Sequence, residues 1–118
     1  MSNSQYKIYN RNVTINGNLK AEVVFSKGVQ TLEGAGAVDL ITPLTHLETT
    51  GANALTLADG EEGQIKTIVM TVDGGNGTLT PENLAGGTTV TFNDVGDSIQ
   101  LLFTNDAWYS LGGTATLA

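Results

Sequence analysis

The sequence predicts an all-β protein, an antiparallel β-sandwich that is jelly-roll-like and carries an extended N-terminal arm. Short runs of alternating apolar and polar residues, rich in Val, Ile, Thr and aromatic side chains, recur about every 8 to 12 residues. Gly-, Asn- and Asp-rich turn signals separate about eight such runs, and none of them shows helical spacing over three turns. We assign residues 1–17 to the arm and residues 18–118 to a single β-sandwich domain.

The composition fits one globular domain. The chain has 118 residues, of which 40% are hydrophobic and 14% charged, and its 17 Thr and 15 Gly favour strands joined by tight turns. It contains no cysteine, which excludes disulfides, thiolate metal sites and Cys nucleophiles. The N-terminal residues lack the apolar run of a secretory signal, and no segment approaches the roughly 20 apolar residues of a membrane span. We therefore expect synthesis in a cytoplasm and no membrane partner.

The charge is unevenly distributed along the chain. Residues 1–27 hold four Lys or Arg and one Glu, a net +3, whereas residues 28–118 hold one Lys and eleven acids, a net −10. The overall charge of −7 argues against a nucleic-acid partner, which requires a basic face. The arm is interpreted either as an ordinary polar terminus or as a segment that docks on an acidic partner or on a neighbouring subunit, with Lys7, Arg11 and Lys20 as its contacts.

The clearest local prediction is a hairpin within residues 96–113, GDSIQLLFTNDAWYSLGG. Asn105-Asp106 tolerates the positive φ of a two-residue turn, so counting outward places Phe103 opposite Trp108 and Gln100 opposite Leu111. One face then presents a core surface that includes Phe103 and Trp108. The opposite face carries Leu102, Tyr109 and Leu111, which are more apolar than a solvent face requires.

Two further segments follow the same rules of alternation. The predicted strand 64–73 has Ile65 and Val69 on its second face, repeating the apolar excess of the hairpin. Leu19–Ser26 alternates cleanly and is predicted to be a half-buried strand. Thr80–Leu84 is predicted to be the one helical turn, because Thr would cap it and Pro81 suits the first helical position.

We find no constellation that carries catalytic chemistry. His46, the single histidine, alternates with Leu44 and Glu48, and no catalytic signature surrounds any serine, so we interpret it as a solvated or core-edge residue rather than a catalytic one. Acidic turns at 59–62, 73–76 and 93–97 lack the ligand spacing of a calcium loop, and Asp, Asn and Gly are expected in turns on backbone geometry alone. We expect no catalytic residue, no metal and no cofactor, and hence no enzyme.

Residues 54–113 resemble a sequence pattern of structural proteins from tailed bacteriophages, especially those of cyanobacteria and other aquatic bacteria. The resemblance rests on LTLADGEEGQIKTIVM, GGNGTLTP, GGTTVTF and GDSIQLLFTNDAW, and it covers about half of the chain. It implies a β-module of the virion, commonly trimeric, without catalytic residues. Such modules resemble parts of both capsid-decorating proteins and fibre or tail proteins.

The first hypothesis is a capsid decoration (cement) protein on the outer shell of the virion. A homotrimer would bury Ile65, Val69, Leu102, Tyr109 and Leu111 between subunits, and the arm would bind the major capsid protein of the same phage. The brevity of the chain favours this hypothesis, because a fibre usually needs a long shaft or a repeat. The second hypothesis is a tail fibre, knob or tail-associated module that recognises a host surface through loops 74–77 and 93–97. A third is a lectin-like accessory protein outside any virus.

Overall fold

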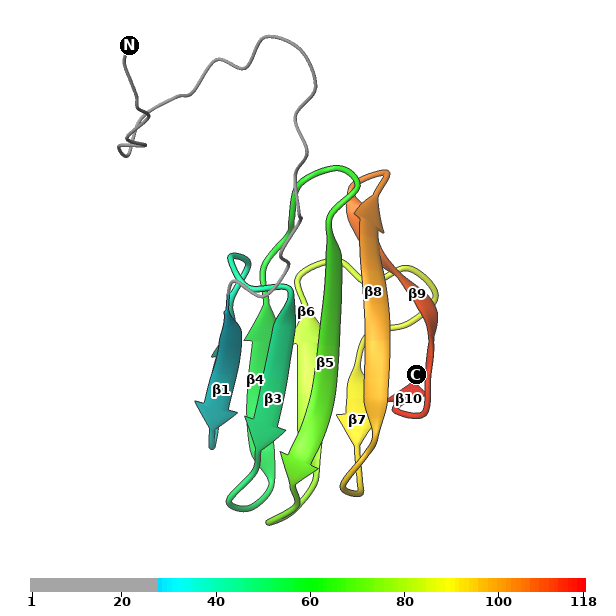
Figure 1. The fold of residues 1–118 in the computed structure, drawn as a ribbon. Coiled ribbons are helices and arrows are strands. Elements are labelled where there is room, and N and C mark those ends of the chain that lie inside the picture. The colour runs from blue at the N-terminus through cyan, green and yellow to red at the C-terminus, as the bar shows by residue number, and fades with distance from the viewer. Residues whose placement is uncertain (1–27) are drawn as a thin grey trace, which may run out of the picture.

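The computed structural model describes residues 28–118, which form ten strands in two packed sheets (Figure 1). The predicted arm and the predicted strand Leu19–Ser26 lie outside the described residues. No helix is present in residues 28–118, and so none that could cross a membrane. The strands are β1 (Val29–Glu33), β2 (Gly36–Val38), β3 (Leu44–Glu48), β4 (Asn53–Leu57), β5 (Ile65–Val72), β6 (Gly77–Pro81), β7 (Val90–Phe92), β8 (Ser98–Thr104), β9 (Ala107–Gly113) and β10 (Thr116–Leu117).

The first six strands alternate between the two sheets. The first sheet has the order β1-β3-β5-β8-β9, and the second has the order β10-β7-β6-β4-β2. Each connection from β1 to β6 crosses from one sheet to the other, so β1, β3 and β5 are parallel neighbours, as are β2, β4 and β6. The result is a short coil of three stacked turns with two strands in each turn.

The last four strands close this coil with antiparallel pairing. β7 pairs with β6, β10 with β7, β8 with β5, and β9 with β8. The all-β sandwich is thus confirmed, but its sheets are mixed, whereas the sequence led us to expect antiparallel pairing in a jelly roll. The difference arises because connections that cross between sheets return each strand beside an earlier one in the same direction.

The closing hairpin follows the predicted register over most of its length. Asn105 and Asp106 have φ of 54° and 64°, and Phe103 lies opposite Trp108, as predicted. The register shifts between Gln100 and Leu101, so Gln100 pairs with Gly112 and not with Leu111, and the prediction fails at that position. A bulge adds one residue to a strand, and counting from the turn cannot detect it.

The predicted helical turn at Thr80–Leu84 is absent. Thr80 and Pro81 belong to β6, where Pro81 pairs with Leu57 of β4. Beyond them, the Asn83 carbonyl accepts a hydrogen bond from the Trp108 amide at 2.9 Å, and the Ala85 amide donates to the Trp108 carbonyl at 2.8 Å. Leu84 therefore forms an isolated parallel bridge with Trp108 of β9, between a bend and a turn, and no helix forms.

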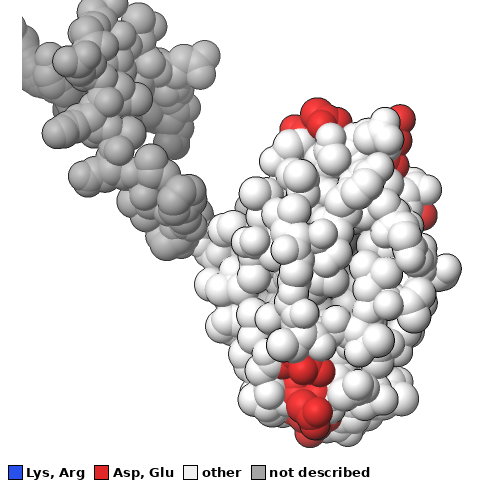
Figure 2. All heavy atoms as spheres, turned by 90° about the vertical axis from the view of Figure 1, so that its right-hand side faces the viewer, with Lys and Arg blue, Asp and Glu red and all other residues white. Residues whose placement is uncertain are grey.

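Acidic residues gather at the two ends of the sandwich. All eleven Asp and Glu of residues 28–118 lie in connections between strands or, for Glu33 and Glu48, at the last residue of a strand. Figure 2, which views the molecule from the β9 side, shows red patches at the top and bottom, no blue, and an uncharged surface between them. The flanks of the sandwich are therefore neutral and its ends negative.

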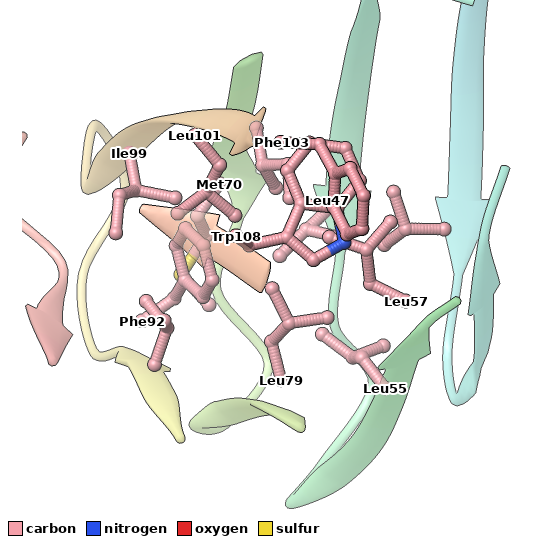
Figure 3. Packing of buried hydrophobic residues seen from close by; sticks show 13 residues of the cluster. Leu47, Leu55, Leu57, Met70, Leu79, Phe92, Ile99, Leu101, Phe103 and Trp108 are labelled. Carbon is pink, nitrogen blue, oxygen red and sulfur yellow. The ribbon is translucent and has the colours of Figure 1, made fainter. Parts of the chain in front are cut away.

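The space between the sheets is filled by one apolar cluster (Figure 3). Trp108 is fully buried, and its ring meets that of Phe103 edge to face at a centroid distance of 5.2 Å. The indole N–H donates to the Ala58 carbonyl at 2.9 Å, which satisfies the one polar atom of that side chain. The buried apolar residues are Val38, Leu47, Leu55, Leu57, Ile68, Met70, Leu79, Val90, Phe92, Ile99, Leu101, Phe103 and Trp108.

Candidate functional site: the outer face of the first sheet

The outer face of the first sheet consists of the side chains of β1, β3, β5, β8 and β9 that point away from the core. On β8, Ile99, Leu101 and Phe103 are buried, so the residues between them point outward. On β5, Lys66, Ile68 and Met70 are buried, which directs the alternating residues of that strand to the same outer face. Its only charged side chains are Glu33 and Glu48, at the ends of β1 and β3.

Three of the five residues predicted for a subunit interface form one row across this face. Ile65 of β5 lies opposite Leu102 of β8, and Leu102 lies opposite Tyr109 of β9. Ile65 is 47% exposed, and Leu102 and Tyr109 are partly exposed. Cross-strand neighbours on one face are in direct reach of each other, so these side chains present a continuous apolar strip.

The other two predicted interface residues lie apart from this row. Val69 is on the same face, farther along β5, between His46 of β3 and Ser98 of β8. Leu111 is 51% exposed and lies at the register shift of β9, outside the regular ladder. The structure thus places Ile65, Val69, Leu102 and Tyr109 on one face and leaves Leu111 at its margin.

The pairing of β1 and β3 with β5 extends the face beyond the predicted residues. Val29, Leu44 and Thr67 form a row that continues to Gln100, and His46 lies beside Val69. The alternation of Leu44, His46 and Glu48 was visible in the sequence. The order of the strands was not visible, so nothing in the sequence predicted that β3 lies beside β5.

The outer face of the second sheet is also uncharged but is built from small side chains. Ala54, Thr78, Thr91 and Thr116 form one cross-strand row over β4, β6, β7 and β10. A second row contains Ala37, Thr56 and Thr80. Threonine suits strand positions that face water, and this face offers no bulky apolar group for a partner to bury.

The one cation of residues 28–118 is buried. Lys66 is 0% exposed, and its ammonium donates to the Thr42 carbonyl at 2.7 Å, the Thr42 hydroxyl at 3.0 Å and Asp39 Oδ1 at 3.2 Å. Burial lowers the pKa of Lys66, and the bond and charge of Asp39 oppose that effect. Burial raises the pKa of Asp39, but hydrogen bonds from Thr42 and Lys66 outweigh it and leave that pKa below its ordinary value. All three ammonium protons have acceptors, so this cluster is structural.

Carboxylates of the acidic turns accept hydrogen bonds from nearby amides of the same fold. Asp97 accepts from the amides of Asn93 at 2.8 Å and Asp94 at 3.1 Å, and these bonds lower its pKa. Asp59 accepts from the Asn83 side-chain amide.

Leu40 and residues 59–64 line a shallow, open depression. Among the described residues, no three His, Asp or Glu side chains come together in a group that could hold a metal ion.

Lys7, Arg11 and Lys20, the predicted capsid-binding residues, lie outside the described residues. In residues 28–118 the candidate functional feature is thus a surface, the outer face of the first sheet, bounded by acidic ends. The sequence matches no protein-family model and no curated protein.

Proposed function

We propose that the chain is a structural protein of tailed-bacteriophage virions, a decoration protein that binds the outer capsid shell as a homotrimer and stabilises it. The observation that carries this proposal is the neutral outer face of the first sheet, with the row of Ile65, Leu102 and Tyr109 at its centre. The phage-like pattern in residues 54–113 supports it from the sequence.

The mechanism is the burial of surface. Burying a contiguous apolar surface against a partner stabilises the complex, because removing apolar area from water contributes a free energy of about 25 cal/mol per Å². Acidic residues confined to the two ends repel those of another copy, which favours side-by-side contact through the neutral flanks. A trimer has threefold symmetry, which allows it to sit on threefold or quasi-threefold positions of a capsid.

Light scattering on the purified full-length protein tests the assembly step. We expect a trimer at micromolar concentration and a shift to monomers in Leu102→Asp. That substitution places a charge on the outer face of the first sheet, where the proposed trimer interface would bury it. The matched control is Thr56→Asp, which introduces the same charge on the outer face of the second sheet and is expected to leave the trimer intact. A monomeric wild-type protein would contradict the proposal.

Capsid binding is tested separately by co-sedimentation with undecorated capsids. Deletion of residues 1–17 is expected to abolish binding while the trimer persists. Binding that survives the deletion would exclude the arm as the contact with the major capsid protein.

A fibre or tail-associated module is the second candidate. The parallel three-turn coil of β1 to β6 favours it, because stacked turns of this kind build elongated β-solenoids. Loops 74–77 and 93–97, its predicted contacts with a host surface, lie at the same end of the sandwich (Figure 1). Labelling the protein on intact virions separates the two candidates: decoration gives a regular lattice of many copies, and a fibre gives a few copies at the tail or a vertex.

A further inference from the structure

The outer face of the first sheet changes in character along its strands. Its apolar strip, with Leu102 at the centre, lies toward one end of the sheet. Its two carboxylates, Glu33 and Glu48, lie opposite each other toward the other end. His46 of β3 lies between these two parts, so the single histidine of the sequence belongs to the candidate surface.

The two strands beside His46 place neutral side chains against it. Thr31 of β1 lies directly opposite on one side, and Val69 of β5 lies opposite on the other. The nearest carboxylates are one position farther along this face, Glu48 on the same strand and Glu33 on β1, and β5 directs only uncharged side chains to it. Among the described residues, these two glutamates are thus the titratable groups that face the imidazole.

The trimer of the proposed function would cover His46, and the inference made here rests on that trimer. Val69 is one of the residues assigned to the subunit interface, and it is the neighbour of His46 in the ladder. Neighbouring strands lie about 4.7–4.9 Å apart, so a surface that covers Val69 also removes water from the imidazole. The ring is already partly buried in the single chain, and contact between subunits would bury the rest.

Histidine is the side chain that ordinarily changes its charge between pH 5 and 8. A neutral imidazole is buried at modest cost, whereas an imidazolium loses much more when water is removed from it. Glu33 and Glu48 attract the charged form, but they do so in the free subunit as well, and the attraction gained in an interface often fails to offset the loss of water. We propose that His46 is a pH-sensitive switch of subunit assembly, neutral in the trimer and protonated in the free subunits that mild acid releases.

Acid favours the free subunits because they bind the proton more tightly than the trimer does. A group that binds its proton less tightly after assembly lowers the association constant as the pH falls, by up to about tenfold per pH unit. A trimer contains three copies of His46, so the association constant is expected to fall by up to about 10³-fold per pH unit. This steep range lies where free subunits are protonated and the trimer is not.

Sedimentation velocity of the full-length protein at micromolar concentration, at about pH 7.5 and about pH 5.5, tests the switch. We expect the wild type to be trimeric at the higher pH and dissociated at the lower. His46→Gln and His46→Leu cannot take up a proton and are expected to stay trimeric at both, whereas His46→Arg carries a permanent charge and should be dissociated at both. The matched control, Thr56→Arg, places the same charge on the outer face of the second sheet and should behave as the wild type.

The results that overturn the switch differ from the result that overturns the trimer. A wild type that is trimeric at both pH values overturns the switch alone, as does a trimeric His46→Arg. Acid dissociation of both neutral variants assigns the effect to carboxylates, and failure of both to form a trimer at the higher pH gives the imidazole a different role; each overturns the switch. Loss of β structure in the wild type at the lower pH, seen by circular dichroism, also overturns it, because acid then acts on the fold. A monomeric wild type at about pH 7.5 overturns the proposed trimer and the switch with it.

Discussion

The ion pair between the buried Lys66 and the partly exposed Asp39 predicts an asymmetric response to mutation. Asp39→Ala leaves a fully buried ammonium without its counter-ion and removes the acceptor for the amides of Ile41 and Thr42. Uncompensated buried charges cost about 3–5 kcal/mol. Lys66→Met removes the charge and keeps a stem of similar size, so its main cost is the orphaned Thr42 carbonyl, about 1–3 kcal/mol.

Urea denaturation of the two variants measures this difference. With a slope of about 1.5 kcal/mol per M, Asp39→Ala is expected to lower the midpoint by about 2–3 M and Lys66→Met by about 0.7–2 M. Asp39→Asn, which keeps the oxygen acceptor and loses the charge, should fall between them. The double variant should cost less than the sum of the single variants, because its second substitution removes the stranded charge. If Lys66→Met costs as much as Asp39→Ala, the buried charge is not the source of the effect.

Three further predictions concern the stability of the sandwich. Trp108→Phe should lower the free energy of unfolding by about 2–4 kcal/mol, because it orphans the Ala58 carbonyl and leaves a cavity; urea denaturation showing less than about 1 kcal/mol would contradict this. Gly113→Ala should cost about 1–3 kcal/mol, since the added Cβ would clash with the Ser98 carbonyl oxygen and the φ of 144° is unfavourable for alanine; a thermal midpoint equal to that of the wild type would show that the strand can shift. Folding lowers the pKa of Asp97, so the ionised carboxylate contributes fully to the stability of the fold above its unfolded pKa of about 3.8. This contribution is lost as the pH falls through the lower pKa of the folded state. Asp97→Asn should therefore flatten the acid limb of a curve of stability against pH, and an unchanged limb would contradict the assignment.

Local signals in the sequence were sufficient to predict the closing hairpin, whose turn and pairing depend on residues close together in the chain. The hairpin at Asn105-Asp106 was predictable because two positive-φ residues set the turn and the ladder follows by counting. The prediction failed at Leu111, where a bulge next to Gly112 and Gly113 shifts the register. The signature of a helix start at Thr80-Pro81 was misleading because tertiary pairing with β4 outweighs a weak local preference.

Non-local features could not be predicted in the same way. Alternation shows which residues of a strand share a face but not which strand lies beside it, so the parallel coil was missed. Lys66 is buried on the same face of β5 as Ile68 and Met70. Its partner Asp39 lies 27 residues earlier in the chain, so no local pattern joins the two. The apolar excess on the strand faces was visible in the sequence, but the common row of Ile65, Leu102 and Tyr109 required the pairing of β5 with β8 and of β8 with β9.

The burial of Lys66 has a consequence for how the protein recognises charge. Since Lys66 is the one cation of residues 28–118, the surface of this part of the chain offers no positive group to an acidic partner. Every accessible positive side chain must come from residues 1–27, which hold Lys7, Arg11, Lys20 and Lys27. Added salt weakens contacts between exposed charges and spares apolar burial, so in the proposed assembly it should release the capsid before it separates copies joined through the first sheet. The proposed function therefore assigns attraction to an anionic surface and cohesion between copies to different stretches of one short chain, and each can be tested by substitutions that leave the other unchanged.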